Sequence, residues 1–162
     1  MSSLTTEVGL PRARTGCDVQ RVDVVTEAIG DFGARYLDRV YTRAEQDGCR
    51  LGGPASLAAR FAAKEAVLKL IGTADGVDLR EVEILTPTGR PEVRLRGRAA
   101  ELAADLGLRA EDIDVSLSHS GDLALAVAAA VISRLPDAAA PADRHARSTS
   151  HPHSPKESGV HD

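Results

Sequence analysis

The chain has 162 residues, a formal net charge of −4 at pH 7, and only two Phe, two Tyr and no Trp. An acidic chain with so few aromatic rings does not have the basic, stacking surface typical of nucleic-acid-binding proteins, and no apolar run reaches the roughly 18 residues of a membrane-spanning helix. The N-terminus lacks the basic-then-apolar order of a signal peptide, so we expect a cytoplasmic protein in which Cys17 and Cys49 are reduced thiols. We expect neither nucleic acid nor a membrane among its partners.

Both ends of the chain differ in composition from its middle. The first residues are small and polar, and the last part consists mainly of Ala, Pro, Ser, His and Asp. Such segments cannot bury enough apolar surface to offset the entropy lost on ordering them. We therefore predict a disordered N-terminus at 1–12, one folded domain at 13–134 and a disordered tail at 135–162.

The domain is predicted to begin with one short strand and a run of helices. Residues 16–19 indicate a buried strand that ends near Asp18. Residues 21–47 have apolar positions at helical spacing, broken near two glycines, Gly30 and Gly33. Within this stretch a threonine and a glutamate three residues apart, in Thr42-Arg-Ala-Glu45, predict a capping box that starts a helix.

The most strongly patterned helix is predicted from Pro54 to about Ile71, where Gly72 stops it. Its apolar positions form one stripe, made of Leu57, Phe61, Leu68 and Ile71. Glu65 and Lys69 lie about 40° apart on another face. An ordinary surface pair of this spacing, worth roughly 0.2–0.5 kcal/mol, is the simplest interpretation of these two residues.

The second half of the domain is predicted to contain a hairpin, a helix and two strands. Alternating residues at 81–86 and 92–96 predict the hairpin, and 98–106 predicts a helix closed by a glycine. Two strands are predicted at 113–117 and 123–132, and the second is a long apolar run that should be central in its sheet. The fold class is therefore α+β, with a small antiparallel sheet packed against a long helix.

Lys64 and Lys69 are two of only three lysines in the chain, which otherwise carries its positive charge on 17 arginines. A lysine suits a place where a flexible point charge meets a phosphate. An aspartate at the end of an apolar strand needs a partner, and a turn cap is the simplest one for Asp18 alone. Together with Glu65, however, Asp18 could supply the one or two carboxylates that Mg²⁺ takes when substrate phosphates complete its shell.

His119 is the only histidine of the predicted domain, because the other four, His145, His151, His153 and His161, lie in the predicted tail. A structural hydrogen-bonding role is one interpretation of His119; a phosphate contact or proton transfer at a strand end is the other. In the tail, a solvated segment is favoured over a metal site at His151 and His153. The sequence contains no phosphate-binding loop of the P-loop type, no dinucleotide-binding glycine motif and no nucleophile elbow.

Three segments then occur in a characteristic order, namely Gly16-Cys-Asp-Val19, Arg60-Phe-Ala-Ala-Lys-Glu-Ala-Val-Leu-Lys69 and Val115-Ser-Leu-Ser-His119. Together they resemble the holo-(acyl carrier protein) synthase family of 4′-phosphopantetheinyl transferases. The middle segment is the most specific of the three, and the resemblance spans about residues 14–133. It implies a 4′-phosphopantetheinyl transferase-like fold and a homotrimer with active sites at subunit interfaces.

The resemblance also implies a reaction: transfer of phosphopantetheine from coenzyme A to a serine of an apo acyl carrier protein, with release of 3′,5′-ADP. Asp18 and Glu65 would hold Mg²⁺, and Glu65 and Lys69 would be catalytic, with Lys69 on the phosphate under attack. The proton acceptor stays open between Glu65 and a metal-bound water. The residues implied to contact the cofactors are Asp18, Arg60, Lys64, Glu65, Lys69, Gly72 and His119.

The chain also departs from the family pattern. Val24 stands where the family usually has an arginine, and the basic residues expected to dock the carrier reduce to Arg21, Arg35 and Arg39. Two alternatives therefore stay open: a non-catalytic homologue that binds coenzyme A or a carrier through an altered docking helix, and a different coenzyme A enzyme with His119 as base. The altered docking residues could also suit a specialised carrier, such as one of polyketide biosynthesis.

Overall fold

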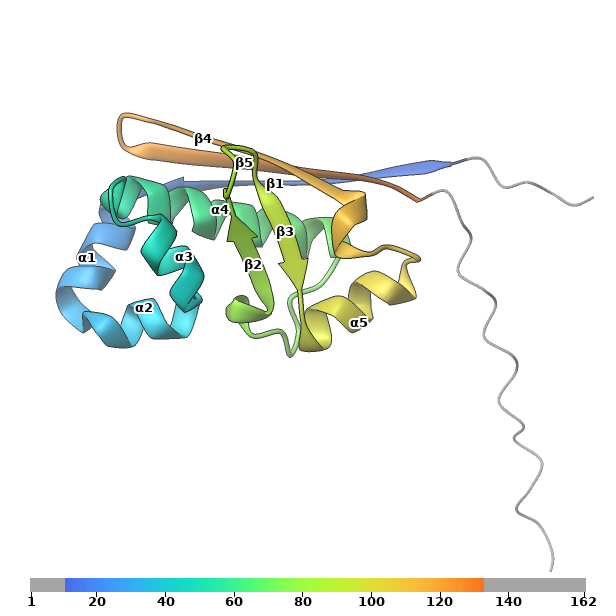
Figure 1. The fold of residues 1–162 in the computed structure, drawn as a ribbon, viewed down its shortest axis with the longest axis horizontal. Helices are drawn as coiled ribbons and strands as arrows, with labels where there is room; N and C mark the ends of the chain where they lie inside the picture. Colours follow the sequence, from blue (N-terminus) through green and yellow to red (C-terminus); the bar gives the residue numbers. More distant parts are fainter. Residues whose placement is uncertain (1–10, 133–162) are drawn as a thin grey trace, which may run out of the picture.

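A three-stranded antiparallel sheet and the long helix α4, which packs against one face of that sheet, form the centre of the fold (Figure 1). The structure is a computed structural model and describes residues 11–132, so the predictions of disorder at 1–10 and 135–162 lie outside the described residues, whereas Arg12, predicted to be disordered, begins strand β1. The strand order β1-β5-β4 confirms the central position of the long apolar strand, and the α+β class is confirmed. The bounds are Arg12–Arg21 for β1, Ile113–Ser120 for β4, Leu123–Ile132 for β5 and Gly53–Ile71 for α4.

Strand β1 extends well beyond the predicted residues 16–19. It pairs with β5 along its whole length, from Arg12 opposite Ile132 to Arg21 opposite Leu123. The polar residues at its start carry no strand signal of their own, because pairing with a central partner strand, rather than local propensity, decides their conformation.

Strand β5 has small residues on one face and larger apolar residues on the other. Its four even-numbered alanines from Ala124 to Ala130 are buried, whereas Leu123, Leu125, Val127 and Val131 are exposed. This alternation follows from the two-residue period of a strand. Figure 1 shows the helices and the second sheet all on the side of α4, so among the described residues nothing covers the opposite, outer face.

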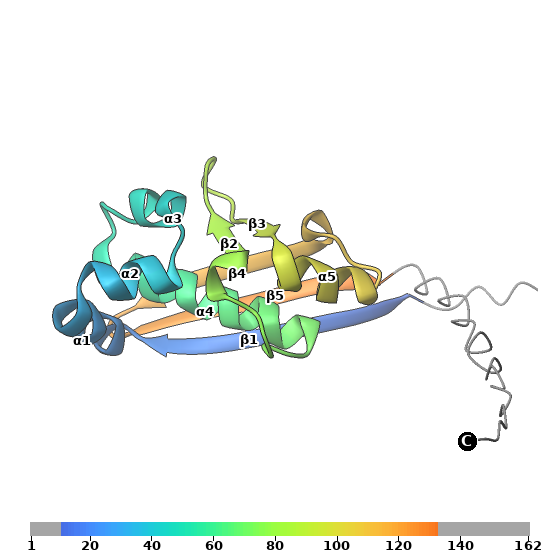
Figure 2. The same ribbon diagram turned by 90° about the horizontal axis from the view of Figure 1, so that it is seen from below.

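Helix α4 is buried on nearly all sides, which corrects the prediction of a single apolar stripe. Twelve of its residues are buried, including Lys64 and Arg60. The reason is its position between the sheet on one side and the remaining elements on the other, so that the side with Glu65 and Lys69 stays accessible while the other sides meet protein (Figure 2). The predicted end is confirmed, because Gly72 adopts a left-handed conformation with φ of 102°.

Three short helices follow β1 and fill one end of the molecule. The predicted capping box is confirmed, since Thr42 and Glu45 exchange side-chain and backbone hydrogen bonds. The predicted break at Gly33 is confirmed by its φ of 54°, but Gly30 lies inside a continuous helix. The helices are α1 (Val22–Phe32), α2 (Ala34–Val40) and α3 (Arg43–Gly48).

The predicted hairpin forms a separate two-stranded sheet beside α4, and the predicted helix follows it. These elements are the 3₁₀ turn η1 (Leu79–Glu81), the strands β2 (Val82–Leu85) and β3 (Glu92–Leu95), the helix α5 (Gly97–Asp105) and the 3₁₀ turn η2 (Ala110–Asp112). Within residues 11–132, none of the helices has the length and apolar character required to cross a bilayer.

Candidate functional site

Strand β1 and helix α4 bring three charged side chains together. The Lys69 Nζ lies 2.7 Å from the Asp18 Oδ1 and 3.1 Å from the Cys17 carbonyl oxygen. The Glu65 carboxyl group is close enough to the Asp18 carboxylate for the negative charge of Asp18 to affect its ionisation. The sequence prediction that Asp18, Glu65 and Lys69 share one site therefore agrees with the geometry.

Gly16 makes this approach possible. A Cβ atom at Gly16 would lie 2.0 Å from the Ala66 carbonyl oxygen and 2.7 Å from the Leu70 amide nitrogen, both of which are backbone atoms of α4. Only a residue without a side chain lets the helix backbone rest directly on β1. The contact fixes the helix beside the strand two residues before Asp18.

The three charges do not form the simple surface pair that helical spacing suggested. Lys69 donates to Asp18 on the strand, and no ion pair joins it to Glu65 among the described residues. Burial raises the pKa of Glu65, the neighbouring Asp18 charge raises it further, and Lys69 lowers it. The hydrogen bond to Asp18 raises the pKa of Lys69. A half-buried carboxyl group whose pKa is raised by burial and by a neighbouring carboxylate is suited to binding a further cation.

Lys64 does not take part in this cluster, which is a correction to its expected phosphate contact. Its side chain is completely buried, and its Nζ donates to the Glu45 Oε2 at 2.8 Å and to the carbonyl oxygens of Leu79 at 3.0 Å and Val82 at 2.6 Å. These three acceptors use all three N–H donors of the ammonium. The physical reason lies in the helical step of 100° between residues 64 and 65, which turns Lys64 toward α3 and β2 instead.

Arg60 lies one helical turn before Lys64 and on the same buried side of α4. Its Nη2 donates to the Thr86 Oγ1 at 2.8 Å, and its Nε is a buried polar atom without a hydrogen-bond partner. An unsatisfied buried donor is costly, so an arginine in this state is ready to bind an acceptor from outside the chain.

His119 lies at the exposed end of β4, on the opposite edge of the sheet from Asp18. His119 of β4 pairs with Ala124 on one side of the central strand β5. Asp18 of β1 pairs with Ala126 on the other side of β5. Two strand spacings separate the two edge strands, about 10 Å in all. One copy of the chain therefore does not bring His119 to the carboxylates.

The residues expected to dock a carrier are not on the first helix. Arg21 lies before α1 and forms an ion pair with Asp23, and Arg35 and Arg39 are exposed on α2. The ionisable residues of α1 itself are all acidic, namely Asp23, Glu27 and Asp31. The break at Gly33 therefore separates Arg35 and Arg39 from the acidic helix α1.

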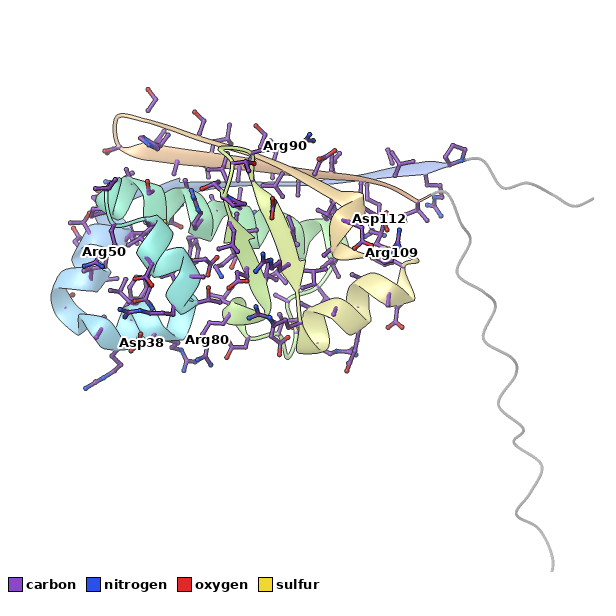
Figure 3. The ribbon with its side chains drawn as sticks, in the orientation of Figure 1. Asp38, Arg50, Arg80, Arg90, Arg109 and Asp112 are labelled. Atoms are coloured by element: carbon purple, nitrogen blue, oxygen red, sulfur yellow. The ribbon has the colours of Figure 1, made fainter. Side chains whose placement is uncertain are left out.

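Two surface clefts lie away from the carboxylates. One, of about 590 Å³, is lined by side chains from α2 and η1 that include Asp38 and Arg80 (Figure 3). The other, of about 360 Å³, is lined by Leu37, Arg50 and neighbouring residues. None of the three clustered side chains lines either cleft, so charge and geometry rather than concavity identify the site.

Glu45 and Arg14 have roles that the sequence analysis did not assign. The capping box indicated that Glu45 starts a helix, but it gave no sign that the same carboxylate neutralises a buried lysine 19 residues away. Arg14 donates from its Nε to the Leu70 carbonyl oxygen at 2.7 Å. The two-residue period of a strand that includes Arg14 would have placed it on the same face as Asp18.

Comparisons with known proteins show what this chain is similar to. The family model for the 4′-phosphopantetheinyl transferase superfamily matches residues 14–128. A holo-[acyl-carrier-protein] synthase of Herpetosiphon aurantiacus is 43% identical over 121 residues, covering 69% of this chain and 93% of that protein. A protein of the same description from Desulforudis audaxviator is 45% identical over 120 residues, covering 72% of this chain and 90% of that protein.

Solved structures of acyl carrier protein synthases also align with this chain. An ACPS–CoA complex of Chronobacterium ammoniagenes aligns with a TM-score of 0.61 at 27% identity, covering 73% of this chain and 96% of that one. An acyl carrier protein synthase of Mycobacterium tuberculosis aligns with a TM-score of 0.55 at 32% identity, covering 74% of this chain and 96% of that one.

Proposed function

This chain belongs to the holo-(acyl carrier protein) synthase family of the 4′-phosphopantetheinyl transferase superfamily, and we propose that it transfers 4′-phosphopantetheine from coenzyme A to a serine hydroxyl of an apo acyl carrier protein, releasing 3′,5′-ADP. The observation that carries this proposal is the cluster of Asp18, Glu65 and Lys69. The 27% identity to a structure that contains coenzyme A supports the choice of co-substrate.

Asp18 and Glu65 fit a Mg²⁺ ion. Within residues 11–132 no group of three or more His, Cys, Asp or Glu residues is arranged to hold a metal. Mg²⁺ does not need one, since it binds through one or two carboxylates and completes its shell with water and substrate phosphates. The raised pKa of Glu65, caused by burial and then by Asp18, indicates a site whose two carboxylates would be stabilised by a cation. When bound, Mg²⁺ would neutralise charge on the pyrophosphate of coenzyme A.

Glu65 and Lys69 would act directly in the transfer. Phosphoryl transfer depends mainly on positioning and on stabilising charge on the phosphoryl oxygens. The Lys69 ammonium, half exposed and held by Asp18, would contact the phosphate under attack. Glu65, whose pKa is raised by burial and by Asp18, would accept the proton of the carrier serine.

Three further residues would bind the rest of coenzyme A. Arg60 offers its unsatisfied Nε, and Gly72, with its left-handed backbone at the end of α4, offers an approach without a side chain. His119 lies on the opposite edge of the sheet and would contribute from a neighbouring copy in the proposed assembly. Lys64 is not included, because its donors are all occupied inside the chain.

Carrier docking would use Arg21, Arg35 and Arg39, with α1 between them. Acyl carrier proteins are acidic, so the acidic residues of α1 would weaken the attraction and favour a less acidic carrier. The exposed Val24 on α1, 49% accessible, would supply apolar contact in place of a charge.

The assembly would be a homotrimer, by analogy with the short members of the family. Five apolar residues on the outer face of the sheet support self-association: Val19, Leu123, Leu125, Val127 and Val131 are each 41–57% exposed. A soluble monomer rarely exposes such a continuous apolar strip. In a cyclic trimer, each contact joins one patch of a subunit to a different patch of the next subunit. The β4 edge of one copy, which carries His119, could therefore meet the β1 edge of the next copy, which carries Asp18.

The two free thiols support a cytoplasmic location. Cys17 is exposed and Cys49 is buried, and neither forms a disulfide within the described residues. Coenzyme A, itself a thiol, is available in the reducing cytoplasm, where exposed cysteines persist.

The decisive test is incubation of the purified protein with coenzyme A, Mg²⁺ and a panel of apo carrier proteins, followed by intact-mass measurement. We expect a phosphopantetheine mass gain on at least one carrier, lost on addition of a chelator and in Asp18→Asn and Glu65→Gln. Glu101→Gln, which removes an exposed carboxylate of α5, serves as the matched control and should keep full activity. Coenzyme A binding without a mass gain on any carrier would instead favour a non-catalytic binding protein. Turnover that survives both substitutions but is lost in His119→Ala would favour a reaction with His119 as base.

Assembly is tested by sedimentation equilibrium. Leu125→Glu places a charge in the centre of the outer face and should give monomers, whereas Val24→Glu, a matched change of an exposed apolar residue on α1, should stay trimeric. A wild-type protein that sediments as a monomer at all concentrations would contradict the trimer.

A further inference from the structure

Arg14 lies on the same face of β1 as Asp18 and four residues before it. Residues 14, 16 and 18 alternate with outward-facing residues, and β1 is an edge strand that pairs only with β5 among the described elements. The separation along the strand is about 13 Å, four steps of about 3.3 Å. The glycine between them, Gly16, is the point where α4 crosses the strand.

The last turn of α4 holds the Arg14 guanidinium in place. Its Nε donates to the Leu70 carbonyl oxygen at 2.7 Å, and its Nη2 lies 3.5 Å from the Ile71 carbonyl oxygen. The same Nη2 would be 3.1 Å from a Cβ atom on Gly72, so the guanidinium lies directly beside the backbone that ends the helix. Helix α4 runs antiparallel to β1 (Figure 2), and Lys69, whose Nζ contacts Asp18, directly precedes Leu70, whose carbonyl oxygen accepts from Arg14.

Within the described part of the chain, no carboxylate neutralises the charge of Arg14. No ion pair joins it to an Asp or Glu within residues 11–132, whereas eight other arginines of that region each form one. A guanidinium has five N–H donors, and the two helix carbonyls use at most two of them. The remaining donors form a planar fork of the kind that binds phosphate with two parallel hydrogen bonds.

We propose that Arg14 binds a phosphate group of coenzyme A that stays on the leaving nucleotide. This inference rests on the proposed function, in which Lys69 contacts the phosphate that is transferred. Arg14 lies beyond Lys69 along the β1 edge, so its donors are placed for a phosphate of the nucleotide that lies farther from the reacting one. Arg14 is then a binding residue for the 3′,5′-ADP part, whereas the transferred 4′-phosphopantetheine part contacts Lys69.

Calorimetric titration of three ligands into the metal-loaded protein tests this assignment. Arg14→Gln should weaken binding of coenzyme A and of 3′,5′-ADP about tenfold, the usual effect of losing one charge-assisted contact, and leave the affinity for pantetheine 4′-phosphate unchanged. Arg14→Lys keeps the charge but not the fork, so its affinities should be intermediate. Arg98→Gln, which removes an exposed arginine of α5, is the matched control and should bind all three ligands as the wild type does.

Thermal unfolding of each ligand-free variant separates binding from helix capping. Arg14→Gln with a lower Tm but wild-type affinity for both nucleotides would overturn the proposal and leave Arg14 as a cap of α4. Equal weakening for all three ligands would also overturn it, because the effect would then not be confined to the nucleotide. A wild-type protein that binds no coenzyme A would refute the proposed function itself, and this inference with it.

Discussion

The buried pair of Lys64 and Glu45 predicts a large loss of stability when one partner is removed. Both side chains have no solvent exposure, so water does not screen the pair, and Lys64→Met would leave the Glu45 carboxylate without its counter-charge. Breaking a buried ion pair in this way costs about 3–5 kcal/mol. The carbonyl oxygens of Leu79 and Val82 would lose their hydrogen bond as well. The expected loss is a large share of the 5–15 kcal/mol that typically stabilises a domain.

Urea denaturation at pH 7, followed by far-ultraviolet circular dichroism, measures this loss. The double variant Lys64→Met, Glu45→Gln removes both charges and should recover part of the loss, because no uncompensated carboxylate then stays buried. If Lys64→Met fails to fold but the double variant folds, the uncompensated Glu45 carboxylate is again the cause of the loss. A Lys64→Met protein within about 1 kcal/mol of the wild type would refute the reasoning, since that small value is typical of an exposed pair.

Lys69→Met is the matched control for this experiment. The Lys69 side chain is half exposed, so its loss should leave the unfolding free energy nearly unchanged while lowering transferase activity. If Lys64→Met lost transferase activity while Lys69→Met kept it, the assignment of the phosphate contact to Lys69 would be wrong.

Three other perturbations follow from the structure. Gly16→Ala should destabilise the protein by about 1–3 kcal/mol or more, because its Cβ would overlap the Ala66 carbonyl oxygen. Gly30→Ala, whose Cβ would meet no neighbouring segment within 4 Å, should instead stabilise α1 by roughly 0.5–1 kcal/mol. Urea denaturation of both variants measures these two changes in the free energy of unfolding. Because burial and a neighbouring carboxylate raise the pKa of Glu65, protons should compete with Mg²⁺ at higher pH than they would at an exposed glutamate. Calorimetry should therefore show that Mg²⁺ affinity falls as the pH is lowered. An affinity that stays constant across the acid range would contradict this prediction. Val24→Arg should lower KM for an acidic carrier roughly 2- to 10-fold at low ionic strength, an effect that added salt removes; a salt-independent change would indicate a different cause.

The central helix and its flanking strands could be predicted from the sequence because their signals are local. The glycine that ends α4, the capping box at Thr42 and the long apolar run of β5 each depend on neighbouring residues, and the structure confirms all three. The sequence also indicated which charged residues to consider together, Asp18, Glu65 and Lys69, but not how they pair. Lys69 binds Asp18 inside β1, rather than Glu65 on its own helix, because the strand and the helix approach each other at Gly16.

The surroundings of Lys64 and the extent of β1 could not be predicted, because both depend on distant parts of the chain. The acceptors of Lys64 come from residues 45, 79 and 82, and helical spacing alone does not distinguish a lysine facing β2 from one facing solvent. Likewise, Arg12 and Arg14 become strand residues only through pairing with β5. Contacts between segments far apart in sequence decided both outcomes.

The alternation of β5 ties the proposed assembly to the stability of each subunit. Its alanines face α4, while its leucines and valines face away from the subunit's own core. In the proposed assembly, association of copies would bury the outer apolar face that the described part of one subunit leaves uncovered. Any free energy gained in that way grows with protein concentration, so the Tm of the wild type should rise with concentration while that of Leu125→Glu stays constant. Dilution, rather than heat or denaturant, would then be the mildest way to weaken this fold.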